Sequence, residues 1–240
     1  MIKRFLKKIS FGIIFKIISK PKLKQQLLNK EEKVLIKLQD EIFLKNNSFY
    51  KSYLQEKGWI QSVLKQEIIE EDGSPVPWMT YPFISFLKPR IKNTFEIFEY
   101  GSGNSTIFFA ERAKNVYAIE HDIDWYDRMK NIVAKNVTLI FEELHYGGKY
   151  CNKVMEFDRL YDLIVIDGRD RVNCCLKAPK ALRKGGAIIL DNSNRKYYNK
   201  GIEFLLESGF KKLDFEGMSP KSPQLSCTSV FYKTDNCLGI

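Results

Sequence analysis

From residue 95 onward, short apolar runs alternate with stretches whose apolar residues recur at helical spacing. The apolar runs predict strands over residues 95–100, 116–121, 137–143, 162–167 and 187–192. The stretches between and after them predict helices through TIFFAERAK, WYDRMKNIVAK, CCLKAPKALRK and YYNKGIEFLLESG. Strands and helices that alternate in units of this length predict an α/β fold, with a doubly wound, mostly parallel sheet and helices on both faces.

The end of the chain departs from this alternation. Two further β-like runs, KKLDFEG and TSVFYK, have no helical stretch between them, so we expect an antiparallel pair at one edge of the sheet. The linking stretch GMSPKSPQLSC is rich in proline and serine and is expected to form a long surface loop. Gly185–Gly186 is expected to end the helix before the strand over 187–192.

The first third of the chain reads as helical. Residues 20–70 carry apolar side chains at helical spacing, and EDGSPVPW then breaks the pattern, which predicts a helical extension over 1–72 and a main domain over 73–240. Residues 1–20 are basic and amphipathic, so this segment either lies on an anionic membrane surface or packs on the body or a partner. It is too short and too charged to span a bilayer, and it lacks the cleavage site of a signal peptide.

The charge of the chain is unevenly distributed. The formal net charge is +10, but residues 1–30 hold nine of the 39 Lys and Arg residues and no acid. The remaining residues are therefore nearly neutral, which disfavours a nucleic-acid partner. Five cysteines without CxxC spacing fit a reducing compartment, so we expect a cytoplasmic protein, with association at the inner membrane surface as the alternative.

The stretch EYGSGNST follows the first predicted strand, at the sheet edge where such folds bind ligands. Gly101 and Gly103 are expected to take positive φ and to leave room for a ligand. Glu120 ends the second strand, where a carboxylate can accept hydrogen bonds from ribose hydroxyls. Both NAD and S-adenosylmethionine suit this arrangement. The dehydrogenase fingerprint requires a third glycine where this chain has Thr106, and the Glu99 carboxylate suits a ligand with an ammonium group.

The stretch from Glu99 to Ser105 resembles motif I of the class I S-adenosylmethionine-dependent methyltransferases, with Ser105 in place of the last glycine. The resemblance extends over roughly residues 91–233 and implies a seven-stranded, Rossmann-like sheet. It also implies that Gly101 and Gly103 line the methionine portion, that Glu99 lies near the amino group and that Glu120 binds the ribose. Adenine contacts are expected from Glu142, Glu143 or Leu144. The expected cofactor-binding residues are Glu99, Gly101, Ser102, Gly103, Ser105, Glu120, His121, Glu143 and Asp167.

The fourth and fifth strands end in VIDGRDR and ILDNSNR, which should face the same crevice. This part resembles the metal-dependent O-methyltransferases of the catechol and caffeoyl-CoA type. The resemblance makes Asp167, Asp191 and Asn192 candidate ligands of Mg²⁺, which would be a second cofactor. Two arginines in DGRDR oppose a bound cation and instead suit a carboxylate or phosphate on the acceptor. In the alternative, Asp167 contacts the cofactor while Asp191 and Asn192 shape a turn.

Methyl transfer requires an aligned nucleophile and, for a hydroxyl acceptor, a base. Asp167 and Asp170 are the candidate bases, Arg169 is grouped with them as catalytic, and His145 lies in a loop that could border the pocket. The aromatic residues Trp78, Tyr81 and Phe83 would form a lid or pack on the sheet. The expected function is O-methylation of a small-molecule or glycan-type acceptor. An NAD-dependent oxidoreductase and a membrane-peripheral binding protein with a vestigial cofactor fold remain as alternatives.

Overall fold

The computed structural model describes residues 52–240, and residues Tyr53–Ile240 form one compact unit. The expectations for residues 1–20, and for the helical pattern up to residue 51, lie outside the described residues. Within the described part, no helix is long and apolar enough to cross a lipid bilayer.

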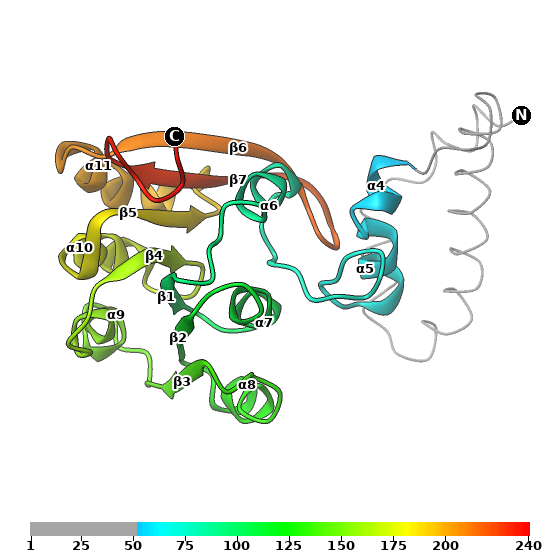
Figure 1. Ribbon diagram of the computed structural model, residues 1–240, viewed down its shortest axis with the longest axis horizontal. Coiled ribbons are helices and arrows are strands. Elements are labelled where there is room, and N and C mark those ends of the chain that lie inside the picture. The colour runs from blue at the N-terminus through cyan, green and yellow to red at the C-terminus, as the bar shows by residue number, and fades with distance from the viewer. Residues whose placement is uncertain (1–51) are drawn as a thin grey trace, which may run out of the picture. The chain divides into compact units, whose positions relative to one another are not determined.

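The seven strands form one sheet in the order β3-β2-β1-β4-β5-β7-β6, as Figure 1 shows. The strands are β1 (Glu96–Tyr100), β2 (Asn115–Glu120), β3 (Val137–Phe141), β4 (Tyr161–Ile166), β5 (Leu182–Asp191), β6 (Lys211–Ser219) and β7 (Ser222–Tyr232). Strands β1 to β5 are parallel, and β7 pairs antiparallel with both β5 and β6. The expected fold class and the antiparallel edge pair are confirmed.

Helices cover both faces of the sheet (Figure 1). One face carries α6 (Tyr81–Leu87), α7 (Asn104–Ala110) and α8 (Ile123–Met129). The other carries α9 (Lys149–Asn152) with the short 3-10 helix η1 (Lys153–Met155), α10 (Arg171–Ala181) and α11 (Asn199–Glu207), which the 3-10 helix η2 (Lys196–Tyr198) precedes. The strands between these layers are apolar on both faces, since β1 and β4 are buried at every position.

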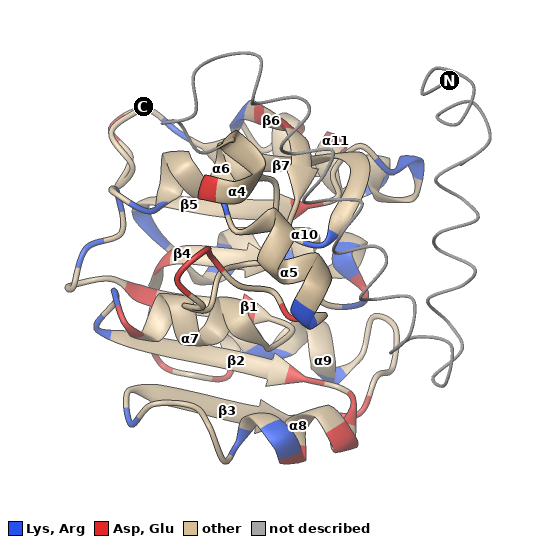
Figure 2. Ribbon diagram, turned by 90° about the vertical axis from the view of Figure 1, so that its right-hand side faces the viewer, with Lys and Arg blue, Asp and Glu red and all other residues tan. Residues whose placement is uncertain are grey.

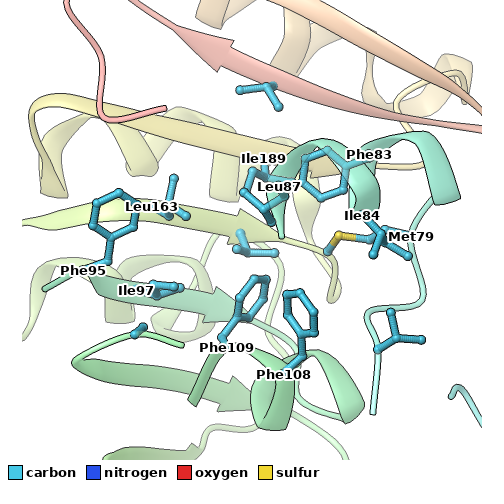
Figure 3. Packing of buried hydrophobic residues seen from close by; sticks show 14 of the residues in the cluster. Met79, Phe83, Ile84, Leu87, Phe95, Ile97, Phe108, Phe109, Leu163 and Ile189 are labelled. Atoms are coloured by element: carbon cyan, nitrogen blue, oxygen red, sulfur yellow. The ribbon is translucent and has the colours of Figure 1, made fainter. Parts of the chain in front are cut away.

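The two faces bury separate apolar clusters. Figure 3 shows the first, in which Phe83 and Leu87 of α6 lie near Ile189 of β5, and Phe109 of α7 lies near Ile97 of β1. The second cluster packs Cys174 and Cys175 of α10 and Leu205 of α11 against the opposite side chains of the same strands. Alternate side chains of one strand point to opposite faces, so Ile97 joins the first cluster and Phe98 the second. These clusters fix the strand ends from which the site is built.

Two sequence-based expectations were wrong. The stretch GMSPKSPQLSC is no long loop, because β6 and β7 continue through it and turn at Pro220 and Lys221. Gly185–Gly186 does not end a helix, because α10 ends at Ala181 and the glycines lie within β5. Gly185 has φ +79° and lies where the register between β4 and β5 shifts, which explains the need for glycine there.

The segment before the first strand packs against the sheet. Helices α4 (Tyr53–Glu56) and α5 (Trp59–Lys65) precede α6, and Trp59 is buried in the first cluster. The Trp59 Nε1 atom donates to the Ser222 carbonyl at 3.2 Å, which joins α5 to the β6–β7 hairpin. A division of the chain between residues 72 and 73 stays a prediction.

Candidate functional site

The carboxyl ends of the central strands open onto a cavity of about 1200 Å³. It lies at β1 and β4, where the strand order reverses and ligands bind in doubly wound sheets. The structure brings most of the predicted site residues to its wall: Glu99, Gly101, Ser102, Gly103, Ser105, Glu120, His121, Asp167, Arg169, Asp191 and Asn192.

The loop after β1 approaches the loop after β4 closely. Gly101 has φ +100°, and a Cβ atom built on it would lie 3.2 Å from the Cα and the nitrogen of Gly168. Both the left-handed backbone and the close approach therefore require glycine at position 101. Gly103 differs from the expectation, since its φ of 162° is ordinary extended backbone. Only Gly101 of this pair needs to be glycine for conformational reasons.

Glu99 is buried at the end of β1, where it faces the cavity with 1% of its surface exposed. Its carboxylate accepts hydrogen bonds from the Ser105 Oγ at 2.5 Å and from the Thr106 Oγ1 at 2.6 Å. Burial raises the pKa of Glu99 to about 8, and these two hydrogen bonds oppose the rise. Ser105 and Thr106 stand where related fingerprints have glycine, and here both hold Glu99 in place.

Glu120 at the end of β2 is also buried, with 4% of its surface exposed. Its Oε2 accepts from the Ser102 Oγ at 2.8 Å, and its Oε1 accepts from the backbone N–H groups of His121 at 2.8 Å and Asp122 at 3.0 Å. Figure 2 shows acidic residues at the tip of β2 and around the start of α8. The predicted ribose carboxylate is therefore oriented by the glycine loop itself and has lone pairs left for a ligand.

Trp125 was missed by the sequence reasoning. It lies on α8, lines the cavity and donates from Nε1 to the Ser102 carbonyl at 2.8 Å. The indole remains 41% exposed, so it offers an aromatic face at the cofactor end of the cavity. Its position just after Asp122, the residue that caps α8, was the available sequence signal.

At the ends of β4 and β5, a guanidinium group lies beside two carboxyl groups. Arg171 Nη2 donates to the Asp167 Oδ1 at 2.8 Å, and its Nη1 lies 3.9 Å from the Asp191 Oδ2. Thr228 on β7 donates to the Asp191 Oδ1 at 2.6 Å. Burial, together with the charge of Asp167, raises the pKa of Asp191 to about 8. Burial raises the pKa of Asp167 as well, and the Arg171 guanidinium opposes that rise. The two carboxyls therefore titrate as a pair, in which the closer contact of Arg171 with Asp167 favours ionisation of Asp167 over that of Asp191.

This arrangement does not fit a magnesium ion. A permanent cation, the Arg171 guanidinium, already pairs with Asp167 and lies beside Asp191, the two carboxyls that were expected to bind the metal. The Asn192 Nδ2 donates to the Ser226 Oγ at 3.2 Å. Among the residues that the structure describes, no three His, Cys, Asp or Glu side chains are grouped so as to hold a metal ion. The magnesium expectation therefore finds no support.

Other predicted residues lie away from the cavity wall. Asp170 is buried, and its two oxygens accept from the Gly147 backbone N–H at 2.8 Å and the Asn173 Nδ2 at 2.7 Å. Glu143 and His145 are exposed on the segment after β3 and do not line the cavity. The roles expected for these three residues stay predictions.

The aromatic segment that leads into α6 and includes its first turn divides between the two roles considered for it. Tyr81 and Phe83 are buried in the core, as packing requires. Trp78 is 51% exposed and lines the cavity, with the Lys221 ammonium 5.8 Å from its ring centroid. Only Trp78 is placed to cover a ligand.

A second wall of the cavity is formed by residues 66–69 and the β6–β7 turn, neither of which carries a recognisable motif. The Asn104 Nδ2 donates to the Ile68 carbonyl at 2.6 Å, and the Lys221 Nζ donates to the Gln66 carbonyl at 3.4 Å. Residues 66–69 therefore connect the start of α7 to the β6–β7 turn, and both ends of this connection line the cavity.

Comparison with known proteins places this geometry in a fold class. No protein-family model matches the chain, and no curated protein matches it. The structure of precorrin-6y C5,15-methyltransferase from Geobacter metallireducens is similar with a TM-score of 0.51 and 18% identity, over 64% of this chain and 87% of that one. Precorrin 8w decarboxylase from Methanobacterium thermoautotrophicum gives 0.50 and 17%, over 71% and 98%.

Spermidine synthase from Thermotoga maritima is also similar, with a TM-score of 0.50 and 12% identity, over 63% of this chain and 57% of that one. The strand order and these similarities show that the chain has the class I methyltransferase fold. At such identities the likeness concerns the fold, so the reaction has to be argued from the site.

Proposed function

We propose that the protein is an S-adenosylmethionine-dependent methyltransferase. The observation that carries the proposal is the wall formed by Glu99, Gly101 and Glu120 at the strand-order reversal of a class I methyltransferase fold. The Glu120 carboxylate complements a ribose diol, and Gly101 lets the ligand reach the backbone. An ammonium group bound beside Glu99 would lower the raised pKa of that carboxyl and so favour the carboxylate that pairs with it.

The site fits this cofactor better than NAD. Thr106 donates to Glu99 and accepts from the Gly103 backbone N–H at 3.0 Å, so its side chain stands where the dehydrogenase fingerprint needs glycine. Glu99 would have no partner beside the pyrophosphate of NAD, whereas the ammonium group of S-adenosylmethionine would provide one. NAD-dependent oxidoreduction is therefore the weaker reading of the same cavity.

The chemistry proposed is O-methylation of a small-molecule or glycan-type acceptor. When bound, S-adenosylmethionine supplies a sulfonium methyl group that an acceptor oxygen can attack in line, with the sulfur–methyl bond breaking and S-adenosylhomocysteine as the leaving group. Asp167 faces the cavity, and Arg171 holds it in one orientation at 2.8 Å. Asp167 is therefore placed to accept the hydroxyl proton as the oxygen–methyl bond forms, and Arg171 to position that carboxylate.

The proposal is tested by incubating the full chain with methyl-labelled S-adenosylmethionine and separate pools of hydroxylated small molecules, oligosaccharides and RNA. We expect label in an ether product from one of the first two pools, and loss of labelling in Asp167→Asn. Label in the RNA pool alone would replace the acceptor class. Reduction of NAD without any methyl transfer would contradict the function itself.

The location of the protein is a separate proposal. We keep the cytoplasm as the compartment and residues 1–20 as a segment for peripheral contact with anionic lipid, on the strength of its basic amphipathic pattern. Co-sedimentation of the full chain and of a chain lacking residues 1–20 with anionic vesicles tests this. Equal sedimentation of both proteins would contradict it.

A further inference from the structure

The three arginines after β4 and β5 differ in what they contact. Arg171 is buried, and its guanidinium donates hydrogen bonds to the Asp167 carboxyl and to the backbone carbonyls of Gly168 and Asp191. Arg169 and Arg195 are exposed and also line the cavity. Within residues 52–240, neither of their guanidinium groups has a hydrogen bond or ion pair to a protein carboxylate. Two permanent cations at the cavity wall therefore remain available to a ligand.

The charges on the cavity wall are divided between its two ends. Glu99, Glu120 and Asp122 lie at the ends of β1 and β2, on the side of the glycine loop. Arg169 and Arg195 follow β4 and β5, and Lys221 lies at the β6–β7 turn. The carboxyls at this second end are those of Asp167 and Asp191, which lie beside Arg171, and Glu67 on the connecting segment is a further exposed acid of the cavity wall. The acidic end complements a cationic methyl donor, and the basic end complements an anionic molecule beside it.

Exposed apolar side chains accompany the basic end. Trp78 is 51% exposed and Leu225 is 68% exposed, and both line the cavity. An aromatic face flanked by cations suits the apolar face of a sugar ring that carries an acidic substituent. A neutral or cationic acceptor would leave Arg169 and Arg195 without a hydrogen-bonded counter-charge, because Asp167, whose carboxyl feels the charge of Arg195, forms its ion pair with Arg171.

We propose that the methyl acceptor is an anionic small molecule, of the acidic-sugar class, whose carboxylate or phosphate is bound by Arg169 and Arg195. This inference rests on the proposed methyl-transfer function, since it names the substrate class of the same cavity. Arginine suits the role because its planar fork donates two hydrogen bonds to one carboxylate or phosphate group.

The test is a binding experiment on the full chain, with and without saturating S-adenosylhomocysteine. D-glucuronate and glucose 1-phosphate are the anionic probes, methyl glucoside is the neutral probe and a 20-nucleotide RNA is the macromolecular probe. The test variant is the double substitution Arg169→Gln/Arg195→Gln. The control is Lys196→Gln, which removes one exposed positive charge outside the cavity. Lys196 is exposed beside Arg195 and does not line the cavity.

We expect at least one anionic sugar to bind more tightly than methyl glucoside, and the double variant to weaken that binding at least tenfold. The Lys196→Gln variant should stay within twofold of the wild type in its affinity for the anionic sugars and for S-adenosylhomocysteine. Tighter binding of D-glucuronate would indicate a carboxylate on the acceptor, and tighter binding of glucose 1-phosphate would indicate a phosphate.

Two results would overturn the inference while the proposed function stands. One is S-adenosylhomocysteine binding with no preference for acidic sugars, or a preference that the double variant keeps. The other is tight RNA binding that needs the same two arginines. Failure of S-adenosylhomocysteine to bind would overturn the proposed function and, with it, this inference.

Discussion

Arg171 donates to Asp167 at 2.8 Å from a side chain that is only 9% exposed. The same guanidinium donates to the Asp191 carbonyl at 2.5 Å, so it ties the end of β4 to the end of β5. An arginine that pairs with the Asp167 carboxyl and lies beside Asp191 takes the electrostatic role that a metal ion would otherwise play. Arg171 is therefore expected to contribute to the stability of the fold and to make the activity independent of divalent metals.

Replacing the guanidinium should destabilise the protein. In Arg171→Met, Asp167 and Asp191 lose their buried cation, and we expect the free energy of unfolding to fall by about 3–5 kcal/mol. Urea denaturation followed by circular dichroism measures this. The control is Lys130→Met, which breaks an exposed pair with Asp127 and should cost at most about 1 kcal/mol. Equal losses in the two variants would show that Arg171 does not neutralise this site.

Removing divalent metals should leave the enzyme active. Because Arg171 satisfies the carboxylates expected to bind Mg²⁺, we predict the same methyl-transfer rate in EDTA and in added magnesium. A rate assay after dialysis against EDTA checks this, with the melting temperature recorded in both conditions. Activity lost in EDTA and restored by Mg²⁺ would contradict the arrangement described.

A methyl group on the glycine loop should block the ligand. In Gly101→Ala the new Cβ would lie 3.2 Å from Gly168, on the wall of the cavity, and we expect the affinity for S-adenosylhomocysteine to fall at least tenfold. Gly209→Ala is the matched control, since Gly209 also has positive φ, at +81°, but lies away from the cavity. Both substitutions carry a backbone strain of about 1 kcal/mol. Calorimetry should separate them, and equal affinities would remove Gly101 from the binding loop.

Asp191 should make stability depend on pH. Its pKa is raised to about 8 in the folded chain, against about 3.9 for an ordinary aspartate, so the folded state keeps a proton that the unfolded state releases. The resulting stabilisation is complete below about pH 4 and is lost as the pH rises through about 8, at no more than about 1.4 kcal/mol per pH unit.

The Asp191→Asn variant removes this titration while its amide oxygen still accepts from Thr228. We therefore expect its unfolding free energy to fall less steeply than that of the wild type between pH 5 and pH 8. Urea denaturation at intervals of one pH unit gives both curves. Parallel curves would mean that Asp191 is ionised in the folded protein.

The sheet was predictable because its central strands carry continuous apolar runs, as in the stretch from Leu163 to Ile166. The β6–β7 extension was not, because its stability comes from residues distant in sequence. Trp59 donates to Ser222, and Pro82 lies within 2.9 Å of the position of a Cβ on Gly217. No local pattern in a stretch rich in proline and serine records such contacts.

That the glycine loop and the two acids would lie together at one end of a cavity was predictable for a similar reason. Gly101, Glu99 and Glu120 belong to short motifs at strand ends, and topology alone brings strand ends together. The role of Arg171 was not predictable, because it depends on where Asp191 and Thr228 lie, on strands that are adjacent only in the folded sheet. The contact of the Lys221 ammonium with the Trp78 ring was not predictable either, because the β6–β7 turn has to form before the two side chains come together.

The measurement that tests the central claim most directly is calorimetric titration of the full chain with S-adenosylhomocysteine and, separately, with NAD. We predict one S-adenosylhomocysteine per chain, no saturable NAD binding, and an affinity at least tenfold weaker in Glu120→Ala, which removes the carboxylate that we propose binds the ribose. NAD binding without S-adenosylhomocysteine binding, or an affinity indifferent to Glu120, would contradict the account.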